Sequence, residues 1–242
     1  MNLSFFRKGT VAIYLLVGLQ SFAFADIAVQ NLRCELLNNP LGVDTPNPRL
    51  SWEVASDERA VVQTFYQILV ASSKDKLDNN EGDVWNSDKV SSDISTLIPC
   101  AESLSGRQQC FWKVKVWTNK GESEWSDVAT FSVGLLQPDD WSAKWIGLDS
   151  AFSWDSYSEF SRLSARYLRK EIKIKDSVKR ATAYIVGLGL YELYINGEKI
   201  GDQVLAPVPT EYPQDVKYNT FDVTEHLQKG KNVLGTVLGN GR

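Results

Sequence analysis

The chain has 242 residues, with 26 basic and 30 acidic side chains and a formal net charge of −4. A mildly acidic surface argues against nucleic acids and anionic membranes as partners, because both attract basic proteins. His226 is the only histidine, and no two of the three cysteines have metal-ligand spacing. We therefore expect no zinc site, no Ser-His-Asp triad and no cofactor, and we expect His226 to be a surface residue.

Residues 1–25 have the three parts of a secretory signal peptide: a positive start, an apolar run at 11–19 and small residues before the cleavage site. The apolar run is too short for a spanning helix, which needs about 20 residues. Cys34 lies too far downstream for a lipid-attachment residue. We therefore predict cleavage after Ala25, a secreted or periplasmic protein and no membrane anchor. Removal of the two basic residues in this segment leaves 24 basic and 30 acidic side chains, a net charge of −6.

The three cysteines, Cys34, Cys100 and Cys110, are an odd number for an exported chain. Cys100 and Cys110 lie ten residues apart and could form a disulfide in an oxidising compartment. The alternative is that all three are small buried side chains that fill the core. The sequence leaves both interpretations open.

Residues 26–134 contain short strand-like runs separated by turn signals. In residues 110–118, Trp112, Val114 and Val116 alternate with Lys113 and Lys115, which is the period-2 pattern of a half-buried strand. Several such runs within about a hundred residues predict a β-sandwich of the fibronectin type III or immunoglobulin type. The runs are LRCEL, RLSWEV, TFYQILVAS, DVWNS, STLIPC, CFWKVKVWT and ATFSVG.

Residues 135–148 are predicted to be a linker. Pro138 and the aspartates after it are typical of a connection between domains. Trp141 and Trp145, four residues apart, predict that burial of their rings holds the connection in place. A flexible tether would be rich in glycine and serine instead, so we expect two rigidly docked domains.

Residues 149–242 predict a second all-β domain, a jelly-roll-like β-sandwich with about five strands. Asn196 and Gly197 are the preferred pair for a type I′ hairpin turn. Asp222 and Glu225 have the spacing of a capping pair for one helical turn. The last apolar run ends in a Gly-Asn-Gly turn signal, and we expect this domain to be incomplete at the C-terminus.

These motifs, in this order, resemble the N-terminal region of bacterial α-L-rhamnosidases, which are glycoside hydrolases. The resemblance covers residues 28–241 and includes NNPLGVDTPNPRLSWEV, WSAKWIG, GLGLYELYINGEKIGD, FDVTEHLQKGKNVLG and LGNG. It implies a fibronectin- or Ig-like domain followed by a β-sandwich domain that helps to recognise substrate. In the family, further β-structure and an (α/α)₆ barrel follow, and the barrel carries the general acid and general base. This chain has no counterpart of that barrel, so no catalytic residue is assigned.

Sugar-binding candidates follow from side-chain chemistry, because aromatic rings stack on the apolar face of a sugar and amides bind its hydroxyls. Tyr191, Asn196 and Tyr212 lie near turns of the second domain and are the predicted sugar-binding residues. The alternative is that such tyrosines pack across strands.

We therefore expect the non-catalytic N-terminal portion of a secreted α-L-rhamnosidase-like enzyme, with a rhamnose-containing glycan as its partner. Two other classes stay open: a stand-alone carbohydrate-binding or adhesion protein, and a purely structural fibronectin-like module. Glycan binding by this chain would separate the second class from the third.

Overall fold

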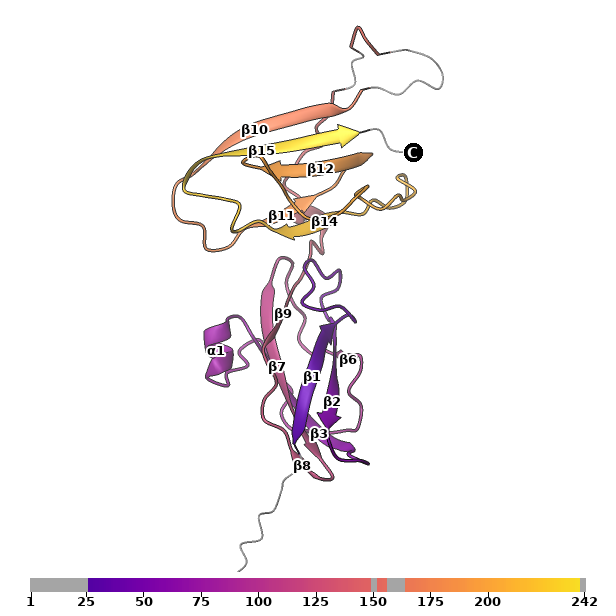
Figure 1. The fold of residues 1–242 in the computed structure, drawn as a ribbon, viewed down its shortest axis with the longest axis vertical. Helices are drawn as coiled ribbons and strands as arrows, with labels where there is room; N and C mark the ends of the chain where they lie inside the picture. The colour runs from indigo at the N-terminus through magenta and orange to yellow at the C-terminus, as the bar shows by residue number, and fades with distance from the viewer. Residues whose placement is uncertain (1–25, 149–151, 156–163, 240–242) are drawn as a thin grey trace, which may run out of the picture.

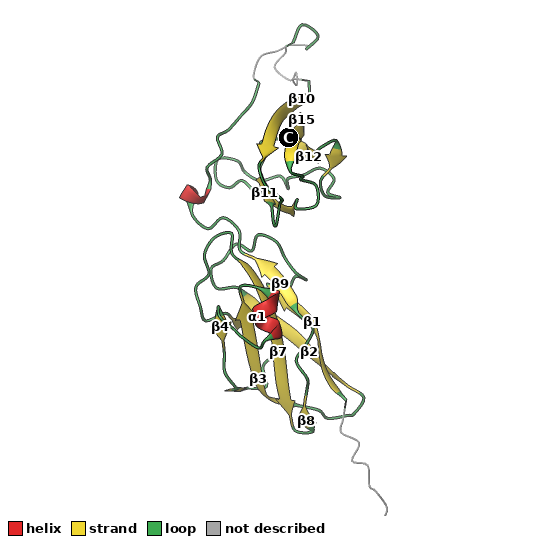
Figure 2. Ribbon diagram, turned by 90° about the vertical axis from the view of Figure 1, so that its left-hand side faces the viewer, coloured by secondary structure: helices red, strands yellow, loops and turns green. Residues whose placement is uncertain are grey.

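The computed structural model describes residues 26–148, 152–155 and 164–239. The predicted signal peptide and the last three residues lie outside this part of the chain. Figure 1 shows two β-domains placed end to end. Nearly all of the regular structure is strand (Figure 2), so the predicted all-β class is confirmed.

The first domain is the part that contains β1 to β9. Its two sheets have the strand order β1-β2-β6 and the order β4-β3-β7-β8, with β5 paired to β3 and β9 paired to β7. Its elements are β1 (Ile27–Cys34), β2 (Arg49–Ser56), β3 (Gln63–Ala71), α1 (Lys74–Asp78), β4 (Trp85–Asn86), β5 (Val90–Ser91), β6 (Ile98–Pro99), β7 (Gln109–Thr118), β8 (Gly121–Glu122) and β9 (Ala129–Ser132), followed by the 3₁₀ turn η1 (Pro138–Asp140).

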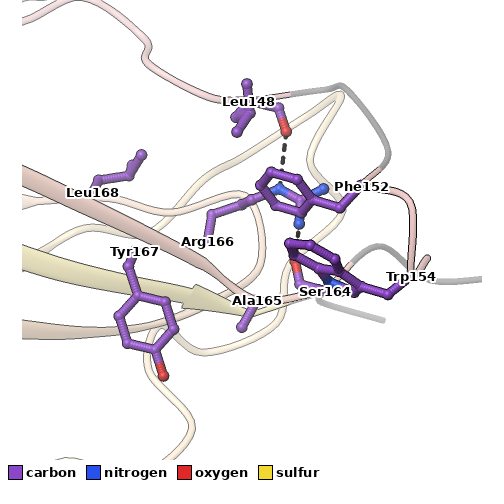
Figure 3. A pocket seen from close by; sticks show the side chains of 8 residues that line it. All are labelled: Leu148, Phe152, Trp154, Ser164, Ala165, Arg166, Tyr167 and Leu168. Atoms are coloured by element: carbon purple, nitrogen blue, oxygen red, sulfur yellow. Dashed lines mark hydrogen bonds between the residues drawn. The ribbon is translucent and has the colours of Figure 1, made fainter.

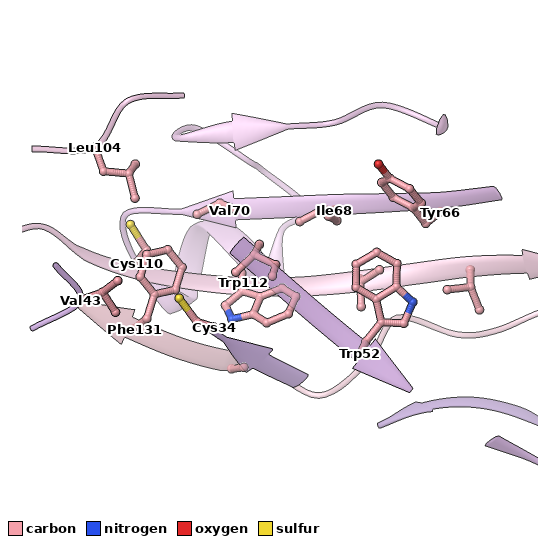
Figure 4. Packing of buried hydrophobic residues seen from close by; sticks show 14 of the residues in the cluster. Cys34, Val43, Trp52, Tyr66, Ile68, Val70, Leu104, Cys110, Trp112 and Phe131 are labelled. Atoms are coloured by element: carbon pink, nitrogen blue, oxygen red, sulfur yellow. The ribbon is translucent and has the colours of Figure 1, made fainter. Parts of the chain in front are cut away.

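The core of the first domain lies between the two sheets (Figure 4). Trp112, Val114 and Val116 all point into it from β7, as the alternation predicted. Lys113, on the other face of β7, is buried as well, because α1 covers that face. Its Nζ donates to Leu77 O at 2.6 Å and to Asn80 Oδ1 at 2.7 Å. Burial lowers the pKa of Lys113.

The three cysteines are buried free thiols of the first domain, and Cys34 and Cys110 belong to its core cluster. The structure therefore does not contain the Cys100–Cys110 disulfide that the sequence left open, and the three side chains fill space as small apolar groups. Burial raises the pKa of Cys34 and of Cys110 to about 12, and it also raises the pKa of Cys100.

The second domain is the part that contains β10 to β15. A four-stranded sheet has the order β10-β15-β12-β13, and β11 and β14 form a separate two-stranded sheet. The second core contains Leu193 and Ile195 from the first of these sheets, with Ala183 and Phe221 from the second. The strands are β10 (Arg166–Ile174), β11 (Thr182–Ile185), β12 (Leu190–Ile195), β13 (Glu198–Lys199), β14 (Asn219–Asp222) and β15 (Gly230–Gly239).

Two local predictions in the second domain have different outcomes. Asn196 and Gly197 have φ values of 53° and 90° between β12 and β13, so the turn with two positive φ angles is confirmed. The prediction of a helical turn capped by Asp222 and Glu225 was wrong. Residues 224–226 form a hydrogen-bonded turn, in which Asp222 accepts from the backbone N–H and the hydroxyl of Thr224. The acidic side chain therefore closes a turn and does not cap a helix.

The connection between the domains follows the prediction at only one of its two tryptophans. Trp141 is half-buried, and its ring lies edge-on to Tyr218 with centroids 5.4 Å apart. Trp145 is 66% exposed, so the prediction that its ring is buried was wrong. The rings at the joint are therefore Trp141 of the connection and Tyr218 of the second domain.

Gln63 gives a test of the first core. Its Oε1 accepts from Trp52 Nε1 at 2.9 Å, and its Nε2 donates to the carbonyls of Ser92 and Ile94. We predict that Gln63→Leu lowers the free energy of unfolding by about 2–4 kcal/mol, because it leaves a buried indole N–H and two carbonyls unpaired. Urea denaturation measures the loss. Gln67→Leu on the same strand, where the amide is hydrogen-bonded at an exposed site, is the control and should cost under about 1 kcal/mol.

Thiol labelling gives a test of the cysteine assignment. Since all three thiols are buried and their pKa values are raised, the reduced native protein should react with none of its cysteines at pH 8 on the time scale of minutes. In urea without reductant, all three should react. Rapid labelling of the native protein, or a single reactive thiol in urea, would contradict the buried free-thiol arrangement.

Candidate functional site

Tyr191 is not available for a sugar. It lies on the core face of β12, paired with Leu238 of β15, and is 6% exposed. Its hydroxyl donates to Asn219 Oδ1 at 2.6 Å, and burial raises its pKa. A buried ring has no free face for stacking, so the structure contradicts this prediction. The alternation along β12 could have placed Tyr191 with Leu193 and Ile195 on the core face.

Asn196 holds the β12–β13 turn against β15. Its amide donates to His226 O at 2.8 Å and to Asn232 Oδ1 at 2.9 Å, and its Oδ1 accepts from Val233 N at 2.9 Å. Both amide hydrogens are thus used within the fold. Its role in sugar binding stays a prediction.

Tyr212 is half-buried, and its hydroxyl accepts from Gly189 N at 3.0 Å. It therefore holds the bend that leads into β12. Tyr191 and Asn196 lie at opposite ends of β12, about 16 Å apart at 3.3 Å per residue. The structure does not bring these two predicted residues together at one site.

Two strongly exposed aromatic rings among the described residues of the second domain lie elsewhere, in residues 152–155 and at the start of β10. Trp154 is 71% exposed and Tyr167 is 81% exposed. Both line a hollow of about 490 Å³, shown in Figure 3. We call it the aromatic hollow. It is lined by Leu148, Phe152, Trp154, Ser164, Ala165, Arg166, Tyr167 and Leu168.

Asp155 organises the wall of the aromatic hollow. It accepts hydrogen bonds from the hydroxyl of Ser164, from Ser164 N at 2.8 Å and from Phe152 N at 2.7 Å. These bonds, with the nearby Arg166 guanidinium, lower the pKa of Asp155 to about 2. A carboxylate that is ionised at every physiological pH thus ties the segment of Phe152 to the start of β10.

Arg166 forms the floor beneath the aromatic rings. Its guanidinium lies 4.5 Å from the centroid of the Phe152 ring and pairs with Asp155 at 3.5 Å. It also donates to Ser164 O at 2.6 Å and to Leu148 O at 3.2 Å. Phe152 in turn stacks on Trp154, with centroids 4.7 Å apart. The exposed indole of Trp154 is therefore held in place by Phe152 and Arg166.

Tyr167 also belongs to the outer face of the four-stranded sheet. In the register it pairs with Val237, which pairs with Glu192 on β12. Glu192 accepts from Tyr194 Oη at 2.7 Å and from Lys199 Nζ at 2.5 Å. The Glu192 carboxylate raises the pKa of Tyr194. This face combines two tyrosines with polar groups, which suits a saccharide better than an apolar ligand.

The carboxyl groups with a clearly shifted pKa in the described residues all shift in the same direction. Each carboxyl group whose pKa clearly departs from its usual value has that pKa lowered, mainly by hydrogen bonds from cationic, hydroxyl or backbone donors. A glycosidase general acid needs the opposite shift, because it must hold a proton near neutral pH. These five groups are Glu35, Asp83, Glu122, Asp155 and Glu192.

Two other kinds of site are absent from the described residues. No group of three or more His, Cys, Asp or Glu side chains in this part of the chain could hold a metal ion. None of the helices within the described ranges is long and apolar enough to cross a membrane.

Two family models match the chain. The model described as "Rha78A-like, N-terminal immunoglobulin domain" matches residues 29–137. The model described as "Alpha-L-rhamnosidase N-terminal domain" matches residues 176–242.

Curated relatives match across the same span. An α-L-rhamnosidase of Formosa agariphila is 40% identical over 220 residues, which cover 84% of this chain and 23% of that protein. An α-L-rhamnosidase of Alteromonas sp. is 34% identical over 207 residues, covering 84% of this chain and 22% of that protein. The chain thus spans about a quarter of the length of these relatives.

Solved structures agree with the sequence matches. An α-L-rhamnosidase from Dictyoglumus thermophilum superposes with a TM-score of 0.81 at 41% identity, over 89% of this chain and 25% of that one. An α-L-rhamnosidase from Aspergillus terreus has a TM-score of 0.74 at 29% identity, over 88% and 24%. The chain belongs to the α-L-rhamnosidase family, and it corresponds to the N-terminal region of that family, an immunoglobulin-like domain followed by a β-sandwich domain.

Proposed function

We propose that this chain is the non-catalytic N-terminal portion of an exported α-L-rhamnosidase, whose catalytic groups belong to the rest of the enzyme. The observation that carries the proposal is that the chain matches the N-terminal domains of the family and spans about a quarter of each relative. A second observation agrees with it. The five described carboxyl groups whose pKa clearly departs from its usual value all have it lowered, whereas hydrolysis of a glycosidic bond needs one carboxyl kept protonated.

The leader supports export. Residues 1–25 have the composition of a secretory signal peptide, and the mature protein would begin at Asp26 in the periplasm or the medium. α-L-Rhamnosidases that act on extracellular glycans would need such a location.

The second part of the proposal is recognition of the rhamnose-bearing glycan at the aromatic hollow. Trp154 and Tyr167 present exposed rings there, and the hydroxyl of the exposed Tyr167 can hydrogen-bond to sugar hydroxyls. Rhamnose is a 6-deoxy sugar with an apolar methyl group, which suits an aromatic platform. Recognition would raise the local concentration of substrate for the catalytic part.

The first test measures catalysis. Exported protein recovered from the periplasm or the medium should begin at Asp26 and should release no nitrophenol from 4-nitrophenyl α-L-rhamnoside above the uncatalysed rate. Release that grows with protein concentration, and that persists in material purified by two independent routes, would contradict a non-catalytic role.

The second test measures recognition. Trp154→Ala and Tyr167→Ala should each weaken binding of an α-L-rhamnosyl oligosaccharide by about 5- to 10-fold, because each removes one stacking face. Titration calorimetry or ligand-observed NMR gives the affinity. Trp145→Ala is the matched control, since this tryptophan is similarly exposed but lies outside the hollow. Equal losses in all three variants, or no binding by the parent protein, would rule out the hollow as the site.

A further inference from the structure

A tyrosine of the second domain fits into a notch of the first. Tyr218 precedes β14, and its Oη accepts from the backbone N–H of Leu135, just beyond β9, at 2.9 Å. Its ring meets Trp141 edge-on at 5.4 Å and lies 6.1 Å from the ring of Tyr184. Burial raises the pKa of Tyr218, so its hydroxyl stays neutral and keeps this contact across the physiological pH range.

The notch consists of two glycines, and neither position has room for a side chain. A Cβ on Gly134 would lie 2.3 Å from Tyr218 Oη and 3.0 Å from Gly42 O. A Cβ on Gly42 would lie 2.3 Å from Thr220 Oγ1, and Gly42 also has a positive φ of 72°. Contacts below 3.0 Å force a neighbour to move. The two domains therefore approach each other where the first domain has no side chains.

The notch is a built part of the first domain. Gly134 N donates to Val43 O at 2.9 Å, and Val43 and Val133 form a parallel bridge. Gly134 O accepts from Arg107 N at 3.0 Å. Arg107 in turn offers its own carbonyl to Arg180 Nη2 of the second domain at 3.2 Å. A second contact thus lies beside the first.

The two-stranded sheet of β11 and β14 connects this contact to the second core. Thr220 pairs with Tyr184, and the two share the face that carries the contact with the first domain. The neighbouring residues Ala183 and Phe221 point the other way, into the second core. Figure 1 shows β11 and β14 between the four-stranded sheet and the tip of the first domain. Loss of the contact would leave one face of this small sheet uncovered.

We propose that Gly42, Gly134, Tyr218 and Thr220 form a lock that fixes the second domain on the first, so that the two domains unfold in one cooperative transition. The interaction surface is this notch, and its partner is the β11–β14 sheet of the same chain. An orientation set by backbone and ring contacts has little freedom to pivot. The role is structural and is independent of saccharide binding.

The test follows unfolding of each domain separately, by hydrogen exchange and mass spectrometry along a urea titration of the whole chain. Peptides from β3 and β7 report the first domain, and peptides from β12 and β15 report the second. In the parent protein both sets should open at one midpoint. Gly134→Ala should split the transition, with the second-domain midpoint falling by about 0.5–1 M urea relative to the first. Gly235→Ala is the control, since its Cβ would be in ordinary contact with Tyr194 at 3.6 Å.

Two tyrosine variants separate the lock from general packing. Tyr218→Phe removes the hydroxyl that accepts from Leu135 and should split the transition by a smaller amount. Tyr184→Phe removes a buried hydroxyl that has no hydrogen-bond partner within the described residues and should keep a single midpoint.

A combined variant decides whether the contact itself is responsible. Adding Tyr218→Phe to Gly134→Ala should narrow the split, because the atom 2.3 Å from the new Cβ is gone. If the midpoint shift of the double variant equals the sum of the shifts of the two single variants, the lock is overturned. Two midpoints in the parent protein would also overturn it, and so would a Gly134→Ala protein that loses stability equally in both domains while it keeps one midpoint. If saccharide binding fails while the split appears, the lock stands and only the recognition proposal falls.

Discussion

A two-stranded sheet is only marginally stable in water unless other elements cover it, and both domains of this protein meet at such a sheet. The core face of β11 and β14 packs under the four-stranded sheet of the second domain. The opposite face carries Thr220, whose hydroxyl reaches Gly42 of the first domain, and Tyr184 beside Tyr218. The β11–β14 sheet thus forms a layer between the four-stranded sheet and the first domain. The outer face of the β11–β14 sheet is covered by the first domain. This contact fixes the position of the four-stranded sheet relative to the first domain.

The placement has a functional consequence for the aromatic hollow. β10 is the edge strand of the four-stranded sheet, on the side away from the first domain (Figure 1). The exposed rings of Trp154 and Tyr167 are therefore held at the far end of the molecule, on a platform that the joint orients. Under the recognition proposal, a platform fixed in this way would present the bound glycan in one defined direction relative to the first domain. If the two domains could pivot relative to each other, this direction would not be fixed.

Prediction from the sequence succeeded where one segment decides its own structure. The seven strand-like runs of the first domain all contain strands, because alternation on a half-buried strand needs no knowledge of distant residues. The Asn196-Gly197 turn was predicted for the same reason, since two adjacent residues fix its φ angles. The predictions failed where a distant segment decides. Lys113 is buried by α1, which covers the outer face of β7. Trp145 is exposed, whereas Trp141 packs against Tyr218 of the second domain.

The sugar-binding candidates show the same division. Tyr191 was chosen for its chemistry and for its place near a turn, but the pairing of β12 with β15 turns it into the core. The aromatic hollow was not predicted, because its residues come from three separate segments, and no local pattern joins them. These segments are the end of the connection at Leu148, residues 152–155, and residues 164–168 at the start of β10. One local signal is present in residues 166–174, where Tyr167 and Leu168 alternate and so lie on opposite faces of a strand.

The amino-acid sequence by itself determined the all-β class, the longer strands, the hairpin turn and the family resemblance, since each depends on neighbouring residues or on motif order. The short strands β5 and β8 lie outside the predicted runs. Only the tertiary structure decided which tyrosine is buried, which ring joins the domains and which aromatic side chains face solvent. The physical reason is that a period-2 pattern divides a strand into two faces without saying what covers each face. The segments that cover a face come from far away in the chain. At the joint, Gly42 and Gly134 of the first domain lie against Thr220 and Tyr218 of the second, and the absence of side chains on the two glycines allows this approach.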